Sequence, residues 1–213
     1  MILTLAAALS GAVSIVAFQT GPWMVAAISK ALTTILIITY AAWREGGDGY
    51  SRAILAGLVA SLTGDVFLLW PQQGFLPGLA AFLLAHLAYL HAFTGGLKRG
   101  LALAPSIGYA VYTVVAFGFL WSSVPTHLRA PVIVYVAALM TMAAAAAARA
   151  TQAKPEKALP ARTAALGAAL FVLSDTILAF DKFMGPIAFA HVFILAAYWL
   201  AQWAIASSVR PER

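Results

Sequence analysis

Cysteine is absent from the 213 residues of this chain, and charged residues make up only 9% of it. Without cysteine the protein has no disulfide, no thiol nucleophile and no cysteine ligand for a metal. A soluble domain carries about 25% charged residues, so water is not the main solvent for this chain. The 63% share of hydrophobic residues indicates instead that its helices lie in a lipid bilayer.

The sequence also lacks the short motifs of several enzyme classes. It has no nucleophile elbow, no glycine-rich phosphate loop and no pair of histidines four residues apart. A zinc site would need His86 and His191 to converge with carboxylates, which their spacing does not predict, so we expect no metal and no cofactor. The net charge is +6, but the basic residues lie in short loops between apolar segments, so we expect no nucleic-acid partner.

Apolar segments separated by Pro, Gly and charged residues predict about eight membrane-spanning helices. A helix needs roughly 20 apolar residues to cross the hydrocarbon, so the length leaves no room for a separate soluble domain. We therefore predict an all-α, polytopic transmembrane helical bundle that forms a single integral membrane domain over residues 1–213. The predicted spans are 2–18, 23–42, 53–70, 78–93, 101–121, 132–148, 161–180 and 187–206.

The basic residues divide unequally between the two sides of this predicted bundle. Arg129 and Lys182 fall on one side, and Lys30 lies inside the second span. Because Lys and Arg are enriched in cytoplasmic loops, we predict cytoplasmic termini in a bacterial inner membrane. We expect segment 149–162 to be a solvated connection. The remaining basic residues, on the predicted cytoplasmic side, are Arg44, Arg52, Lys98, Arg99, Arg149, Lys154, Lys157, Arg162, Arg210 and Arg213.

A short internal similarity relates the third and seventh predicted spans. Asp65 is followed by Val-Phe-Leu-Leu-Trp and Asp175 by Thr-Ile-Leu-Ala-Phe, and a histidine follows on the next span in each case, His86 and His191. Because the two copies lie four spans apart, their helices would run in the same direction, as in a parallel 4+4 duplication. Chance similarity of a short segment is the alternative.

Ionisable residues inside the predicted spans gather in one layer of the bundle. Asp65 and Asp175 each lie five residues before the end of a span, which places both roughly 8 Å below the extracytoplasmic boundary. By the same measure Lys30 lies roughly 10 Å, His86 roughly 12 Å and His191 roughly 6 Å below it. Because an ionised side chain in hydrocarbon costs several kcal/mol, we predict that these residues face one internal polar cavity.

Other polar residues accompany this layer. Asp181 and Lys182 lie at the rim of the seventh span, while Tyr89, Tyr198 and Gln202 lie inside spans, where their polar atoms need partners. The latter three either line the cavity or bridge helices. A purely structural interpretation also exists, in which the buried lysine pairs with one aspartate to fix helix packing and the histidines donate to backbone carbonyls.

The two carboxyl groups are the strongest catalytic feature of the sequence. An aspartate beside Lys30 would stay ionised, while one in an apolar niche would stay protonated. Such a pair supplies an acid and a base together.

Four groups of residues carry a family resemblance and occur in order within the eight-span frame. They are Ser29-Lys30-Ala31-Leu32-Thr33; Gly64-Asp65 with Phe75, Gly78, Phe82, Ala85, His86 and Tyr89; Ser174-Asp175 with Leu178, Ala179, Lys182 and Phe183; and Tyr198 with Ala201 and Gln202. In this order the sequence resembles the YhhN-like family of membrane proteins, the lysoplasmalogenases, over most of its length. Ala31 departs from the family pattern, which has a proline after the lysine.

The resemblance implies an ether hydrolase that splits the vinyl ether bond of a lysoplasmalogen into a fatty aldehyde and a glycerophosphoethanolamine or glycerophosphocholine. That reaction needs an acid to protonate the β-carbon, an anion to stabilise the cation and a water. Asp65 and Asp175 would fill the catalytic roles in unassigned order, and Lys30 or Lys182 would hold the phosphate. The expected supporting residues are Lys30, His86, Tyr89, Ser174, Asp181, Lys182, His191, Tyr198 and Gln202.

The resemblance makes a lysophospholipid the predicted substrate and membrane lipids the surrounding partners, and the sequence leaves a homodimer open. The alternative function is a proton-coupled transporter or lipid flippase that uses the same Asp, His and Lys side chains as a relay. Against it, the spans show no matching Gly or Pro breaks, and the charges lie nearer one face than the midplane. A structural membrane subunit would explain the hydropathy but not the acids.

Overall fold

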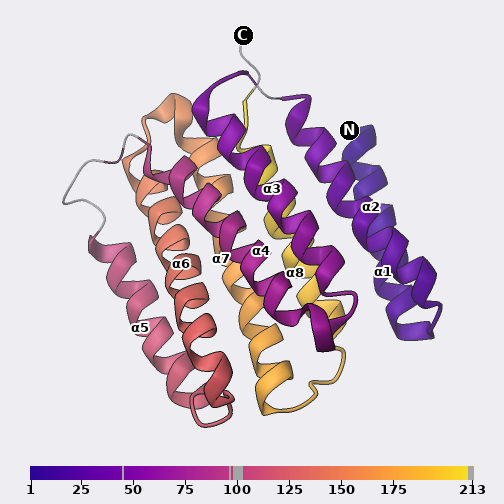
Figure 1. The fold of residues 1–213 in the computed structure, drawn as a ribbon. Helices are drawn as coiled ribbons and strands as arrows, with labels where there is room; N and C mark the ends of the chain where they lie inside the picture. Colours follow the sequence, from indigo (N-terminus) through magenta and orange to yellow (C-terminus); the bar gives the residue numbers. More distant parts are fainter. Residues whose placement is uncertain (45, 96, 98–102, 211–213) are drawn as a thin grey trace.

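In a computed structural model the chain folds as a bundle of α-helices that run along a common axis (Figure 1). The structure describes residues 1–44, 46–95, 97 and 103–210. Lys98, Arg99 and Arg213, and the predicted start of the fifth span at residue 101, lie outside the described residues. The helices are α1 Ile2–Thr20, α2 Trp23–Ala42, α3 Gly49–Phe67, α4 Pro71–Thr94, α5 Leu103–Leu120, α6 Thr126–Gln152, α7 Pro155–Met184 and α8 Ala190–Ser207.

The predicted fold class is confirmed, because the part of the chain that the structure describes holds eight helices and no strand. Six of them, α1, α2, α4, α6, α7 and α8, are long and apolar enough to cross a membrane. The fifth helix is a shorter apolar one. Helix α3 is 19 residues long but carries Arg52, Asp65 and several Gly and Ser residues, which lower its mean hydropathy.

Proline near a helix start explains why three helices begin earlier than predicted. Each contains a proline about two turns after its first residue, Pro77 in α4, Pro131 in α6 and Pro160 in α7. A proline at this position removes one backbone hydrogen bond, and that bond would have gone to a residue in the first turns of the helix. The sequence prediction treated each proline as a helix boundary and placed a loop before it. The predicted solvated connection over 149–162 is therefore wrong, since α6 continues to Gln152 and α7 begins at Pro155.

Part of the helix packing corresponds to a 4+4 arrangement, although the α1–α8 and α3–α8 contacts have no counterpart among the described residues. The hairpin α3–α4 corresponds to α7–α8, the contact α2–α3 to α6–α7, and the contact α4–α6 to α8–α2. Helix α5 packs mainly on α6 and less extensively on α7. The two termini lie at the same end of the bundle (Figure 1).

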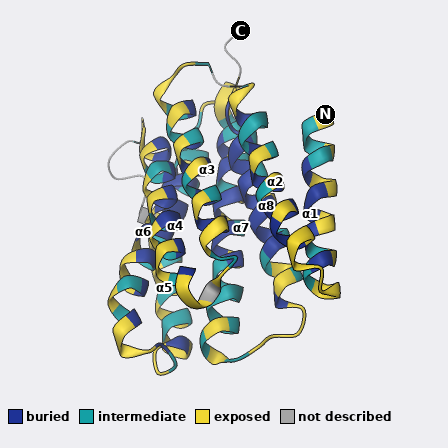
Figure 2. Ribbon diagram, turned by 45° about the vertical axis from the view of Figure 1, so that its right-hand side comes forward, coloured by how far each residue is buried: buried dark blue, intermediate teal, exposed yellow. Residues whose placement is uncertain are grey.

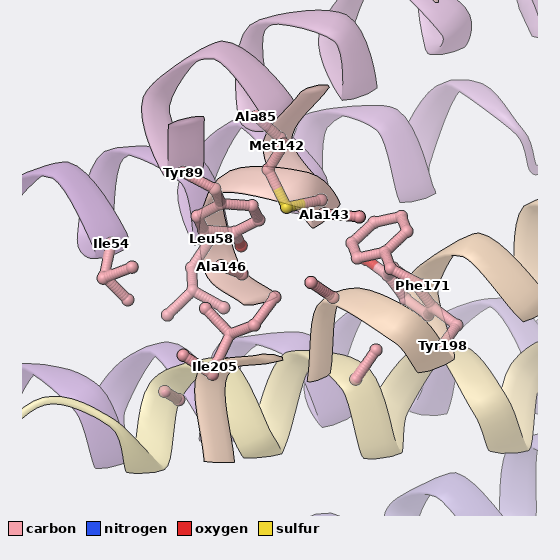
Figure 3. Close-up of a cluster of buried hydrophobic side chains, with 14 of the residues drawn as sticks. Ile54, Leu58, Ala85, Tyr89, Met142, Ala143, Ala146, Phe171, Tyr198 and Ile205 are labelled. Carbon is pink, nitrogen blue, oxygen red and sulfur yellow. The ribbon is translucent and has the colours of Figure 1, made fainter. Parts of the chain in front are cut away.

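Small residues allow the helices to approach closely around a buried core. A Cβ added at Gly167 of α7 would lie 2.8 Å from the Ala201 carbonyl oxygen of α8, so the two backbones nearly touch. Figure 3 shows the centre of this core, where side chains of α3, α4, α6, α7 and α8 meet. Among them are Leu58, Tyr89 and Met142, all fully buried.

The outer surface of the bundle is apolar. Exposed residues line the outward side of the helices (Figure 2), and large hydrophobic side chains are among the most exposed, including Leu9 at 68%, Leu84 at 61% and Val114 at 72%. A soluble monomer rarely exposes a continuous apolar surface of this kind. Together with the helix lengths, this surface identifies an integral, multi-pass membrane protein.

Candidate active site

A cavity of about 350 Å³ lies inside the bundle near the end opposite the termini. Helices α3 to α8 form its walls, and Lys30 is the contribution from α2. Most of its lining is apolar, with Phe75, Phe82 and Phe117 among the larger side chains. The polar residues that line it are Lys30, Asp65, Tyr112, Thr113, Tyr135, Ser174, Asp175, Thr176, Asp181, Lys182, His191 and Tyr198.

Asp65 is held near the end of α3 by a cation and two hydroxyl groups. Thr34 and Tyr198 each donate to its Oδ2 at 2.7 Å. The Lys30 ammonium lies 3.4 Å from Oδ1 and donates to the Asp65 backbone carbonyl at 3.2 Å. The carboxyl group is 3% exposed and the lysine side chain 8%, so this is a buried ion pair. The ammonium group and the two hydroxyl donors at the carboxylate oxygens each interact favourably with a negative charge there.

Asp175 on α7 has different surroundings. The Tyr135 hydroxyl donates to its Oδ2 at 2.5 Å, and the His86 Nε2 atom lies 3.0 Å from the same hydroxyl and 3.6 Å from Oδ2. No lysine or arginine is paired with Asp175 among the described residues. Its side chain is 14% exposed, toward the cavity that it lines.

The Asp175 hydrogen bonds form a chain that runs into the core. Because Tyr135 donates to Asp175, its oxygen accepts from His86, which places a proton on Nε2 of that ring. The His86 ring is fully buried and packs edge-on against Phe171, with ring centroids 4.7 Å apart. Its Nδ1 atom has no partner among the described residues.

The two aspartates are bound in a pseudo-symmetric way. Asp65 on α3 is contacted from α2 and α8, and Asp175 on α7 is contacted from α6 and α4. These helices are the equivalents of one another in a 4+4 arrangement. The positions correspond, but the chemistry differs, because α2 provides a lysine and a threonine where α6 provides a tyrosine.

The positions of the two aspartates along their helices differ from those predicted from the sequence. Asp65 lies two residues before the end of α3 and Asp175 nine before the end of α7, so the expected five residues in each case are wrong. Helix α3 ends sooner because the chain turns toward α4 at Leu68–Trp70, and α7 continues to Met184 past its apolar segment. Both acids nevertheless line the same cavity.

Not every predicted site residue faces the cavity. Lys30, Asp65, Ser174, Asp175, Asp181, Lys182, His191 and Tyr198 line it. The expectation for His86 needs correction, because its ring is fully buried beside Tyr135 and Asp175 and does not line the cavity. Tyr89 and Gln202 bridge helices instead, with the tyrosine hydroxyl donating to Gln202 Oε1 at 2.7 Å.

The remaining predicted residues make local contacts at the cavity wall and rim. Ser174 donates to the Ile194 carbonyl oxygen at 3.0 Å, which joins α7 to α8. Asp181 accepts from the Ile187 amide at 2.8 Å and so orders the connection between these helices. The Lys182 ammonium lies 4.0 Å from the centre of the Phe75 ring.

Sequence reasoning missed Tyr135 and Thr34. Tyr135 is a buried hydroxyl inside a predicted span, which is the same signal that selected Tyr89 and Tyr198. Thr34 carried no signal, because threonine in a membrane helix usually bonds its own backbone. Within the described ranges, no group of three or more His, Asp or Glu side chains is arranged to hold a metal ion.

Comparisons with known proteins identify the family. The YhhN family model matches residues 25–209. The protein named lysoplasmalogenase TMEM86B of Sus scrofa is 34% identical over 88% of this chain and 76% of its own length. Its Homo sapiens counterpart is 34% identical over 86% and 74%. An uncharacterized membrane protein, YhhN of Escherichia coli O157:H7, is 28% identical over 65% and 66%.

No solved structure matches the chain. The match to the family model includes both aspartates and nearly every residue of the cavity. The chain therefore belongs to the YhhN family.

Proposed function

We propose that this protein is a lysoplasmalogenase, an ether hydrolase that splits the vinyl ether bond of a lysophospholipid into a fatty aldehyde and a glycerophospho-base. The observation that carries the proposal is the pair of unequal carboxyl groups on one apolar cavity, one in an ion pair with Lys30 and one beside His86 and Tyr135 without a lysine or arginine partner among the described residues. Relatives that are 34% identical bear the name of this activity.

The unequal surroundings support one order of the two roles that the sequence leaves open. Asp65 is the fixed carboxylate, because Lys30 and two hydroxyl donors stabilise its charge. Asp175 is the acid, because no lysine or arginine among the described residues is paired with it and its side chain reaches the cavity. Tyr135 and His86 act as positioning residues that hold the Asp175 carboxyl group by one oxygen.

The reaction follows from these roles. Asp175 gives its proton to the β-carbon of the vinyl ether, and the resulting oxocarbenium ion is stabilised by the negative charge of Asp65. Water adds to the cationic carbon and loses a proton to the Asp175 carboxylate. The hemiacetal then collapses, so that the aldehyde leaves and the glycerol oxygen takes up a proton. The acid is restored, and no cofactor is consumed.

The rim of the cavity suits the lipid head group. Lys182 and Asp181 lie beyond Asp175 toward the end of α7, so a phosphate at Lys182 would leave the ether bond of the lipid beside the two acids. We propose that this end faces the extracytoplasmic side of a bacterial inner membrane and that both termini are cytoplasmic. The support for that orientation is the excess of basic residues at the opposite end.

The test is release of aldehyde from a purified lysoplasmenyl lipid, with ethanolamine and choline head groups. The saturated alkyl ether analogue is the control substrate, because it has no double bond to protonate. Asp175→Asn should lower the rate at least about 100-fold, the lower end of general acid catalysis, and keep the melting temperature. Asp48→Asn is the matched variant that should keep full activity, since Asp48 caps the far end of α3.

Two results would overturn the proposal. The first is a folded wild-type protein that releases no aldehyde from either lipid, and lipid movement across vesicles in its place would favour the transporter or flippase. The second is a folded Asp175→Asn variant with near full activity, which would remove Asp175 from the mechanism.

A further inference from the structure

A second apolar space adjoins the cavity on the outside of the bundle. It is a groove of about 430 Å³ between α5 and α7, lined by Pro105, Gly108, Tyr109, Ala169, Val172 and Leu173. Tyr112 lines both the groove and the cavity. Among the described residues no charged side chain lines the groove, so its chemistry suits hydrocarbon.

A side-chain hydrogen bond joins α5 to α7 where the two spaces meet at Tyr112. The Tyr112 hydroxyl lies 2.7 Å from Thr176 Oγ1, across the seam between α5 and α7. Thr176 uses its own proton to bond the Val172 carbonyl oxygen at 2.7 Å, so Tyr112 is the donor in the bridge. Helix α5 is packed less extensively on α7 than on α6 and lies at the edge of the bundle (Figure 1). The contact between α5 and α7 is thus a small one.

Charged, acidic and apolar residues occur along α7 in the same order as the head group, ether bond and hydrocarbon chain of a single-chain lipid. Lys182 lies at the rim, Asp175 about 10 Å further in, and Ala169 of the groove about 9 Å beyond that, at 1.5 Å per residue. A lipid presents a charged head group, then the ether bond, then a hydrocarbon chain. The polar rim, the acids and the groove would meet these parts in turn.

We propose that the groove between α5 and α7 is the binding site for the alkenyl chain of the substrate. The chain leaves the cavity past Tyr112 at the seam, and its far end lies in the groove. This proposal rests on the proposed function, since it assigns the ether bond to the cavity at Asp175. The groove then determines the specificity for chain length, whereas the rim binds the head group.

Gly108 provides a clean test of this site. Gly108 is exposed and a Cβ added there meets no atom within 4 Å, so we expect a larger side chain to be tolerated by the fold and to occupy the groove. Gly118 is the matched control, because it lies exposed on the same helix, has the same open space and lines neither the groove nor the cavity.

The experiment compares Gly108→Phe with Gly118→Phe on two lysoplasmenyl lipids. One has a long alkenyl chain, and the other has a chain too short to pass Tyr112. Gly108→Phe should raise the KM for the long-chain lipid at least about tenfold, the loss from two or more methylenes kept out of an apolar site. The KM for the short-chain lipid, and both values in Gly118→Phe, should stay near wild type. A KM that rises equally for both lipids, or for neither, would overturn the proposal.

A photolabel separates failure of the groove from failure of the proposed function. A lysoplasmenyl lipid with a diazirine at the end of its chain should label the residues of the groove in wild-type protein, whether or not hydrolysis occurs. The Gly108→Phe substitution should abolish that labelling. Labels spread evenly over the lipid-facing helices would refute the groove even if aldehyde is released. Labels in the groove without aldehyde release would refute the hydrolase instead.

Discussion

Replacing Asp65 by asparagine should destabilise this protein much more than replacing Asp175. The Asp65 variant would leave the Lys30 ammonium, which is 7% exposed, charged and without its carboxylate. Breaking a buried pair in this way costs about 3 to 5 kcal/mol. For a chain of this size, that cost lowers the melting temperature by about 6 to 20 °C. Asp175 has no such partner, so asparagine there keeps the Tyr135 contact and leaves no unmatched charge.

The assay is thermal unfolding of each variant in the same detergent, with the Lys30→Met/Asp65→Asn double variant as the critical control. Removing both members of the pair deletes the unmatched charge, so the double variant should be more stable than Asp65→Asn alone. The coupling between the two sites should exceed about 1 kcal/mol, as expected for residues in contact. If Asp65→Asn melts at the wild-type temperature, or if the two losses simply add, the pair is not the buried ion pair that the geometry shows.

Two further predictions concern packing and helix capping. Gly57→Ala should destabilise the protein by about 1 to 3 kcal/mol, because the new methyl group would lie less than 3.0 Å from the Tyr89 ring. Gly49→Ala, where a Cβ meets nothing within 4 Å, should leave the stability unchanged. Equal melting temperatures in these two variants would refute this account. Hydrogen bonds from the side chain and the backbone amide of Ser51 lower the pKa of Asp48 from its ordinary value of 3.8, so Asp48→Ala should cost about 1 kcal/mol at neutral pH. A carboxyl group whose pKa is lower in the folded than in the unfolded protein stabilises the fold above the unfolded-state pKa, and this stabilisation is lost as the pH falls through the folded-state pKa. The difference in melting temperature between wild type and Asp48→Ala should therefore shrink below about pH 4. A difference that does not depend on pH would contradict this capping role.

The sequence by itself determined the solvent, the fold class and the position of most site residues in the chain. Apolar runs of about 20 residues admit only helices in hydrocarbon, because every backbone polar group there must be satisfied within its own segment. The cost of burying charge made Lys30, Asp65 and Asp175 conspicuous. These inferences need only composition and local pattern, so they did not depend on how the helices pack.

Only the tertiary structure decided which groups touch. Helix order in space paired Lys30 with Asp65 rather than Asp175 and brought His86 and Tyr135 together at Asp175. It turned Tyr89 and Gln202 into a bridge between α4 and α8, and it put a groove of α5 and α7 beside the cavity. The side-chain contacts among these residues join positions 35 to 113 apart. Such pairings depend on helix rotation and crossing, which small residues such as Gly57 and Gly167 set through close backbone approach and which no local pattern encodes.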